Sequence, residues 1–168
     1  MLPKINTILY ATGLGTRAPY VFRHALSLAR QYQAKIVALH CIEPLSTFGQ
    51  SLVGQYLSEE ESAALHSKAK DTVTAKLRQR LATLCARECE GKPECSTAVS
   101  EICIVEDHPA QAIIEFANRY KADVIVMGAQ RHTMVGEVIL GSTTRKVLHD
   151  ASQPVLVVKV PKGMEEEI

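Results

Sequence analysis

The sequence has no tryptophan, few other aromatic residues and almost no net charge. Aromatic side chains make up 5% of the 168 residues, and the formal net charge is +1. A base-stacking surface requires aromatic rings, and attraction to nucleic acid or to an anionic membrane requires an excess of basic residues. The composition therefore favours neither nucleic acid nor a membrane as the partner.

Long apolar runs are missing as well. No stretch of the chain approaches the roughly 18 apolar residues of a membrane-spanning helix. The first residues also lack the basic stretch and apolar core of a secretory signal. We therefore expect a cytoplasmic protein whose five cysteines are thiols. A composition of 46% hydrophobic and 22% charged residues is typical of a globular domain.

Strand-like and helix-like segments alternate along the chain. Apolar runs predict strands at residues 5–10, 35–42, 98–105, 123–127 and 154–160. Helices are predicted at residues 17–32, from Ser58 to about 90, from Pro109, and after Gly141. This alternation predicts an α/β fold with a single doubly wound, five-stranded parallel sheet. We expect residues 43–57 to be irregular and the acidic tail, residues 163–168, to be frayed.

The long central helix carries two clear signals. Ser58 precedes Glu61 by three residues, which is the spacing of a capping box. Apolar side chains then recur at every fourth position, which predicts that one face of the helix is buried. The residues of this stripe are Leu65, Ala69, Val73, Leu77, Leu81 and Cys85.

Two glycines flank a candidate anion site near the end of the chain. Gly128 ends the fourth predicted strand, and Gly141 precedes Ser142-Thr143-Thr144 at the start of the last helix. The unpaired amides of a helix N-terminus, with these hydroxyls and Ser142 as the helix cap, suit a phosphate. Arg131 or Arg145 could add positive charge. The simpler alternative is a plain turn followed by a plain cap.

The same residues resemble a known family. Nucleotide-binding members of the universal stress protein family carry Gly, two residues, Gly, nine residues, Gly, then Ser or Thr; Gly128, Gly141 and Ser142 keep this spacing. The segments from Pro109 to Gly128 and from Leu140 to Lys159 are also similar to that family. The resemblance covers about residues 4–160. It implies a Rossmann-like fold of the adenine nucleotide alpha hydrolase type, strand order 3-2-1-4-5, and a domain over residues 1–162.

The resemblance also implies a ligand, ATP with magnesium, bound by a stress-response module that signals by binding rather than by catalysis. Two residues depart from the family pattern: Arg131 replaces its middle glycine, and Gly13 stands where binding members usually have an aspartate. A pure interaction protein with a degenerate cleft is therefore the alternative. The candidate ligand-binding residues are Thr12, Gly13, Cys41 and Ile42 on the base side, and Met127, Gly128, Arg131, Gly141, Ser142, Thr143 and Thr144 around ribose and phosphate.

A competing motif lies after the first strand. Gly13-Leu-Gly15-Thr-Arg-Ala18 matches the dinucleotide fingerprint G-x-G-x-x-A, and Glu43 ends the second strand where such folds place a ribose-binding acid. The chain supplies too few strands for the two halves of a dinucleotide-binding domain. We therefore interpret these glycines as shaping a turn.

Cysteines and histidines give weaker signals. Cys85, Cys89 and Cys95 could be separate thiols, a Cys89–Cys95 disulfide or part of a metal site; because no fourth ligand is evident, we predict no metal. Cys41 and Cys103 are expected to pack as small hydrophobic residues. His40 is expected to be structural, and His108 and His132 to be exposed near the cleft.

Two expectations concern activity and assembly. No paired carboxylates or nucleophile–base pattern is evident, so we expect no catalytic residues and at most slow ATP hydrolysis. The last strand, Val155 to Val160, would be an apolar sheet edge, which is an aggregation hazard when bare. Pairing with the same strand of a second copy would give a homodimer, as in many members of the family.

Overall fold

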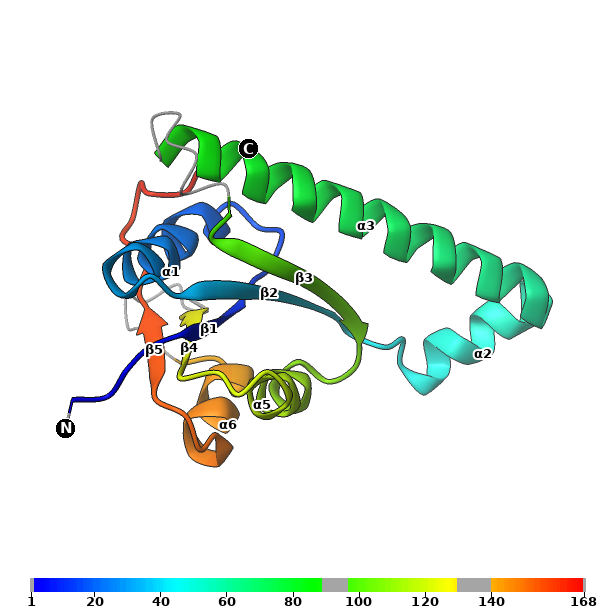
Figure 1. Ribbon diagram of the computed structural model, residues 1–168. Coiled ribbons are helices and arrows are strands. Elements are labelled where there is room, and N and C mark those ends of the chain that lie inside the picture. The colour runs from blue at the N-terminus through cyan, green and yellow to red at the C-terminus, as the bar shows by residue number, and fades with distance from the viewer. Residues whose placement is uncertain (1, 89–96, 130–139, 168) are drawn as a thin grey trace.

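Five short runs rich in Ile, Val and Leu form one parallel sheet. The computed structural model describes residues 2–88, 97–129 and 140–167. Its strands are β1 (Thr7–Ala11), β2 (Lys35–Ile42), β3 (Val99–Glu106), β4 (Val124–Gly128) and β5 (Val155–Val158). They pair in the order β3-β2-β1-β4-β5, all in parallel (Figure 1). The predicted sheet and its strand order are confirmed.

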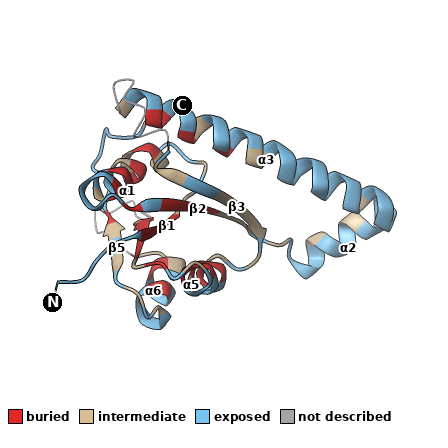
Figure 2. Cartoon of the chain, viewed as in Figure 1, coloured by how far each residue is buried: buried red, intermediate tan, exposed pale blue. Residues whose placement is uncertain are grey.

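Helices cover both faces of the sheet. On one face, α1 (Ala18–Tyr32) and the end of α3 (Glu59–Glu88) pack on strand residues such as Ile8 and Tyr10. On the other, α5 (Pro109–Arg119) and α6 (Ser142–Asp150) pack on residues such as Leu9. Successive strand residues point to opposite faces, so a sheet covered on both sides has apolar residues at consecutive positions. This is why β1 and β4 are buried almost throughout (Figure 2).

The segment predicted to be irregular forms a helix instead. α2 (Thr47–Tyr56) begins after Ser46, whose Oγ accepts a hydrogen bond from Gly49 N at 3.2 Å. A glycine inside a helix costs only about 1 kcal/mol relative to alanine. Gly49 and Gly54 therefore weaken this helix without preventing it. The prediction of an irregular segment is confirmed for residues 43–46 and wrong for residues 47–56.

Helix α3 follows the prediction at its start and departs from it along its length. The capping box is confirmed, because Glu61 N donates to Ser58 Oγ at 3.2 Å and Ser58 N donates to Glu61 Oε2 at 2.8 Å. The predicted buried stripe is only half correct. Leu81 is 4% exposed, whereas Leu65 is 56% exposed. The first half of α3 extends past the edge of the sheet, where the fold provides no surface to cover it (Figures 1 and 2).

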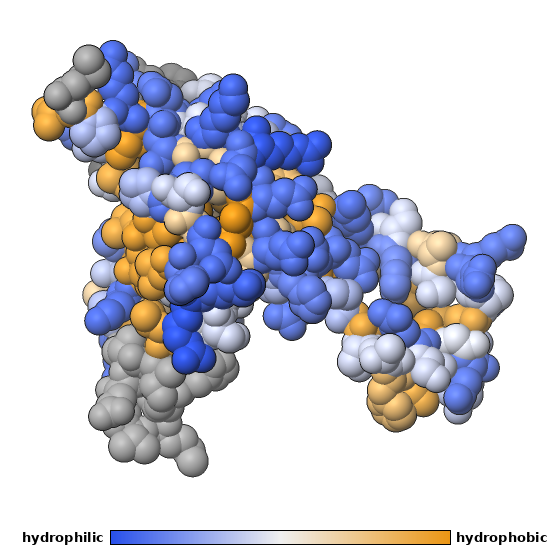
Figure 3. Space-filling model, turned by 90° about the horizontal axis from the view of Figure 1, so that it is seen from below, coloured by the Kyte–Doolittle hydropathy of each residue, from blue (hydrophilic) through white to orange (hydrophobic). Residues whose placement is uncertain are grey.

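Helix α2 and the first half of α3, residues 47–76, thus form a projecting arm. Apolar side chains are exposed on it, with Phe48 at 73% and Tyr56 at 82%. Figure 3 shows apolar and polar residues intermingled at the outer end of this arm. Apolar residues of the arm therefore contribute little to the core that stabilises the sheet.

Two substitutions on one helix test this division. Leu81→Ala removes a side chain buried against the sheet and should lower the free energy of unfolding by about 2–5 kcal/mol. Leu65→Ala is the matched control on the arm and should change it by about 0.5 kcal/mol or less. Urea denaturation followed by circular dichroism gives both values. Equal losses for the two variants would contradict the separation of arm and core.

Candidate functional site

A cavity of about 340 Å³ lies at the carboxyl ends of β1, β2 and β4. In the sheet, β2 lies on one side of β1, and β4, which follows β3 in the chain, lies on the other side. The connections on the two sides of β1 diverge there, which leaves the opening where open α/β sheets bind their ligands. Residues from the loop after β1 and from the starts of α1, α5 and α6 complete the wall.

Most of the predicted binding residues meet in this cavity. The residues that line it as predicted are Thr12, Gly13, Cys41, Met127, Gly128, Thr143 and Thr144. Ile42, Gly141 and Ser142 lie beside it at the end of β2 and the start of α6 but do not line it. Arg131 and His132 lie outside the described residues.

Three polar residues of the wall were not among the predicted binding residues. Arg17, His40 and Glu43 all line the cavity. His40 was interpreted as structural and Glu43 only as part of a dinucleotide motif. His40 and Glu43 lie at the carboxyl end of β2, and Arg17 lies where the loop after β1 enters α1. These positions are the signal that could have identified the three residues.

Hydrogen bonds to its backbone carbonyl groups hold the loop after β1 in place. Thr12 O accepts from the His40 ring at 2.8 Å, Gly13 O from the Thr12 hydroxyl at 2.9 Å, and Leu14 O from the Arg80 guanidinium. The next two oxygens accept backbone amides, from Ala18 at 3.1 Å and from Glu166 at 2.8 Å. Donors from the loop itself, β2, α1, α3 and the C-terminal tail therefore fix five successive carbonyl groups of the loop beside the cavity.

The contact to Thr12 also fixes the tautomer of His40. A carbonyl oxygen can only accept, so Nδ1 must carry the proton in this hydrogen bond. In the neutral ring, Nε2 is then an acceptor. His40 is therefore structural, as predicted, and also presents a polar group to the cavity wall.

The two ends of the glycine motif have different roles. A Cβ atom on Gly128 would lie 3.1 Å from Val21 Cγ2, so glycine allows α1 to pack closely on the end of β4. Gly141 is the N-cap of α6, and Ser142 is its first helical residue. The prediction that Ser142 caps the helix was wrong. The first amides of an α-helix lack partners within the helix, and the cavity is lined by Thr143 and Thr144 from that first turn.

The cysteines of the described ranges are unreactive or structural. Burial, with a smaller contribution from Asp107, raises the pKa of Cys41 to about 11, so its thiol is protonated at neutral pH. Cys85 is a buried free thiol. Cys103 Sγ lies 3.3 Å from the Tyr120 hydroxyl, so it does more than pack as a small hydrophobic residue. Cys89 and Cys95 lie outside the described residues, so their pairing stays a prediction.

The described ranges contain neither a candidate metal site nor a candidate membrane span. They contain no group of three or more His, Cys, Asp or Glu side chains that could hold a metal ion. Within the same ranges, no helix is both long and apolar enough to cross a membrane.

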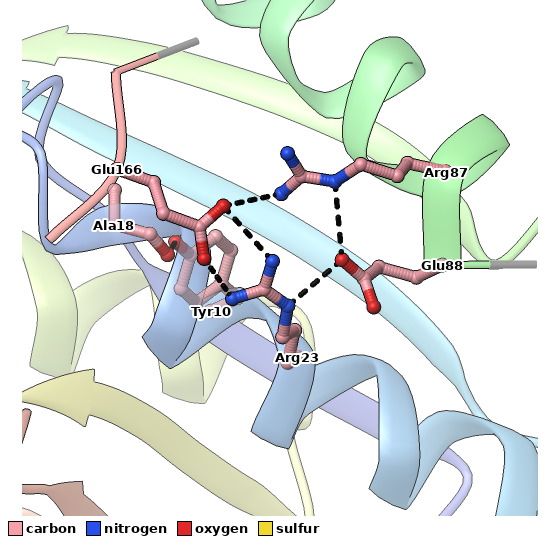
Figure 4. A network of polar contacts seen from close by, with 6 residues as sticks. All are labelled: Tyr10, Ala18, Arg23, Arg87, Glu88 and Glu166. Carbon is pink, nitrogen blue, oxygen red and sulfur yellow. Dashed lines mark hydrogen bonds and ion pairs between the residues drawn. The ribbon is translucent and has the colours of Figure 1, made fainter. Parts of the chain in front are cut away.

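The acidic tail is anchored rather than frayed (Figure 4). The Glu166 carboxylate pairs with the Arg23 guanidinium through both oxygens and with Arg87 at 2.6 Å. Glu88 pairs with the same two arginines, at 2.8 Å to Arg23 and 3.3 Å to Arg87. The expectation of a frayed tail overlooked this cluster, whose members come from three distant parts of the chain. Glu165 also approaches Arg17, with 3.6 Å between Oε1 and Nε.

The fold is an α/β fold of the Rossmann-like type with a cavity at the strand ends. The universal stress protein family model matches residues 4–159, and the chain belongs to this family. Universal stress protein MJ0531 of Methanocaldococcus jannaschii is 30% identical over 146 residues, which cover 83% of this chain and 74% of that protein.

Two solved structures of similar fold contain adenine nucleotides. A universal stress protein in complex with cAMP has a TM-score of 0.59 and 19% identity, over 95% of this chain and 100% of the other. The universal stress protein of Archaeoglobus fulgidus in complex with dAMP has a TM-score of 0.50 and 18% identity, over 93% and 98%. At these identities the comparison shows the shared fold.

The anchored tail predicts a specific pH dependence of stability. The hydrogen bond to Arg23 is the main cause that lowers the pKa of Glu166 to about 2, with Arg87 assisting. The stabilisation is complete above the unfolded pKa of about 4.3 and is lost as the pH falls toward the folded value. Glu166→Gln should therefore lower the melting temperature at pH 7, and the difference from the wild type should shrink between pH 5 and pH 3. Glu167→Gln is the control with the same change of charge, and a pH-independent difference for Glu166→Gln would contradict the assignment.

Proposed function

We propose that this chain is a binding module that holds an adenine nucleotide in the cavity at the strand ends. ATP with magnesium is the proposed ligand, and binding rather than turnover carries the signal in a stress response. The observation that supports this most directly is the placement of Thr143 and Thr144. They bring the amide-rich start of α6 to a cavity of about 340 Å³ that is also lined by the loop after β1.

The phosphates are assigned to the start of α6. Amides at a helix N-terminus and the positive end of the helix dipole favour an anion, and hydroxyls add further donors. Gly141 leaves the approach to this turn free of a side chain. A site of this type suits a ligand with one phosphate or with several. The similar structures solved with cAMP and dAMP hold ligands with one phosphate.

The base and ribose are assigned to the side formed by β1 and β2. Apolar atoms of Cys41, Ile113 and Met127 offer a surface for the flat base, and His40 and Glu43 offer polar partners for ribose or base. A mostly apolar wall with a few placed polar groups is typical of small-molecule sites. Burial raises the pKa of Cys41 to about 11, so this side of the cavity presents a neutral thiol at neutral pH.

We further propose that the active unit is a homodimer joined through the β5 edge. β5 lies at the end of the sheet and pairs with β4 on its inner side, and Leu156 remains 37% exposed. Pairing of this edge with its copy, over Val155 to Val160, would satisfy its outer backbone groups. Analytical ultracentrifugation should give the mass of two chains, and the mass of one chain at micromolar concentration would contradict this assembly.

A matched pair of substitutions at Gly141 tests the nucleotide site. The φ of −59° at this N-cap suits any residue, and Asp and Asn are about equally good caps. Gly141→Asp should abolish ATP binding because it places a carboxylate against the phosphates. Gly141→Asn has nearly the same shape without the charge and should retain more binding. A thermal shift assay gives the ranking, since a ligand at 100 times its Kd stabilises the fold by about 2.7 kcal/mol.

The remaining outcomes separate the rival functions. Unchanged ATP affinity in Gly141→Asp would place the site elsewhere. No shift with ATP, AMP or cAMP at millimolar concentration would favour the protein as a pure interaction module. Release of phosphate above background, lost in Gly141→Asp, would instead identify a slow ATPase.

A further inference from the structure

The positive charge of the cavity is already paired with an acid from the far end of the chain. Among the described residues that line the cavity, Arg17 is the only arginine or lysine. Its Nε lies 3.6 Å from Glu165 Oε1, and the two side chains are 38% and 36% exposed. A ligand anion that used this guanidinium would meet a carboxylate already beside it.

Contacts other than the Arg17 pair hold the tail in this place. The backbone amide of Glu166 donates to Thr16 O at 2.8 Å, directly before Arg17, and its carboxylate is bound by Arg23 and Arg87 (Figure 4). Gly163 N donates to Glu165 Oε2 at 3.0 Å, which orients that carboxylate. Glu165 therefore faces Arg17 at a high effective concentration, whether or not the two groups are paired at a given moment.

The pair itself is weak enough to be exchanged. A separation of 3.6 Å exceeds the hydrogen-bond range, and exposed ion pairs contribute little to stability. A phosphate group offers a guanidinium two charge-assisted hydrogen bonds in a bidentate arrangement. Phosphate is thus the stronger partner for Arg17. Glu165 is the weaker partner, but it belongs to the same chain and is present without any ligand.

We propose that the C-terminal tail is a built-in competitor of the ligand, in which Glu165 occupies Arg17 until a phosphate of the bound nucleotide replaces it. This rests on the proposed function, and it adds Arg17 to the phosphate-binding residues. The apparent affinity is reduced by the fraction of time that Arg17 is engaged. The exchange leaves the contacts of Glu166 intact, so the tail stays anchored while Glu165 moves.

The wild-type protein and two single-substitution variants test the competition directly. The Kd for ATP with magnesium is measured by isothermal titration calorimetry at one ionic strength for the wild type, Glu165→Gln and Glu167→Gln. Glu165→Gln should bind about two- to fivefold more tightly, the range of an exposed ion pair. Glu167→Gln removes the same charge two residues away, at a side chain with no ion pair within the described part of the chain, and should match the wild type.

A double-mutant cycle assigns the gain to Arg17. Arg17→Gln should weaken binding, and adding Glu165→Gln to it should give no further gain. Equal affinities for the Glu165→Gln and Glu167→Gln proteins, or a gain that persists without Arg17, would overturn the competitor while leaving nucleotide binding established. Binding detected only in Glu165→Gln would support it strongly. Absence of binding in every protein, including Glu165→Gln, would overturn both the competitor and the proposed function.

Discussion

The loop after β1 is the part of the molecule on which its other features depend. Five successive backbone carbonyl groups, from Thr12 to Thr16, each receive a donor, and the donors come from the loop itself, β2, α1, α3 and the tail. Four of the five donors lie outside the loop, so these hydrogen bonds tie its backbone to other parts of the fold. The sheet, the long helix and the last residues of the chain must therefore all be in place before the cavity has its wall, which couples the site to the whole fold.

Features of the fold and site that depend on local sequence patterns could be predicted from the sequence. Apolar runs in 35–42 and 123–127 correctly predicted strands, and Gly128 and Thr143, both predicted to bind the ligand, line one cavity. Long-range contacts could not be predicted in this way. Glu166 meets Arg23 across 143 positions of the chain, and no periodicity in either segment signals the other. The stripe on α3 failed for a related reason, since spacing shows which side of a helix is apolar but not how far the neighbouring sheet extends.

Positive potential at the cavity comes from two sources, one fixed and one that can be neutralised. The start of α6 provides a fixed field from backbone amides, which no side-chain movement can remove. Arg17 provides a charge that the tail can neutralise. On the proposed function, a bound nucleotide would meet a permanent anion site and an adjustable one in the same cavity. The proposed competition would join the family's glycine motif to a tail that lies outside residues 4–159 matched by the family model.

The projecting arm has a different consequence, for the dynamics of the chain. Every residue of α2 keeps part of its surface exposed, so opening this helix uncovers little additional apolar area. Segments of this kind unfold locally at a free energy well below that of the whole domain. Amide protons of α2 and the first turns of α3 should thus exchange with solvent by a separate, faster route than those of β1 and β4, while the sheet and the cavity at its strand ends stay folded.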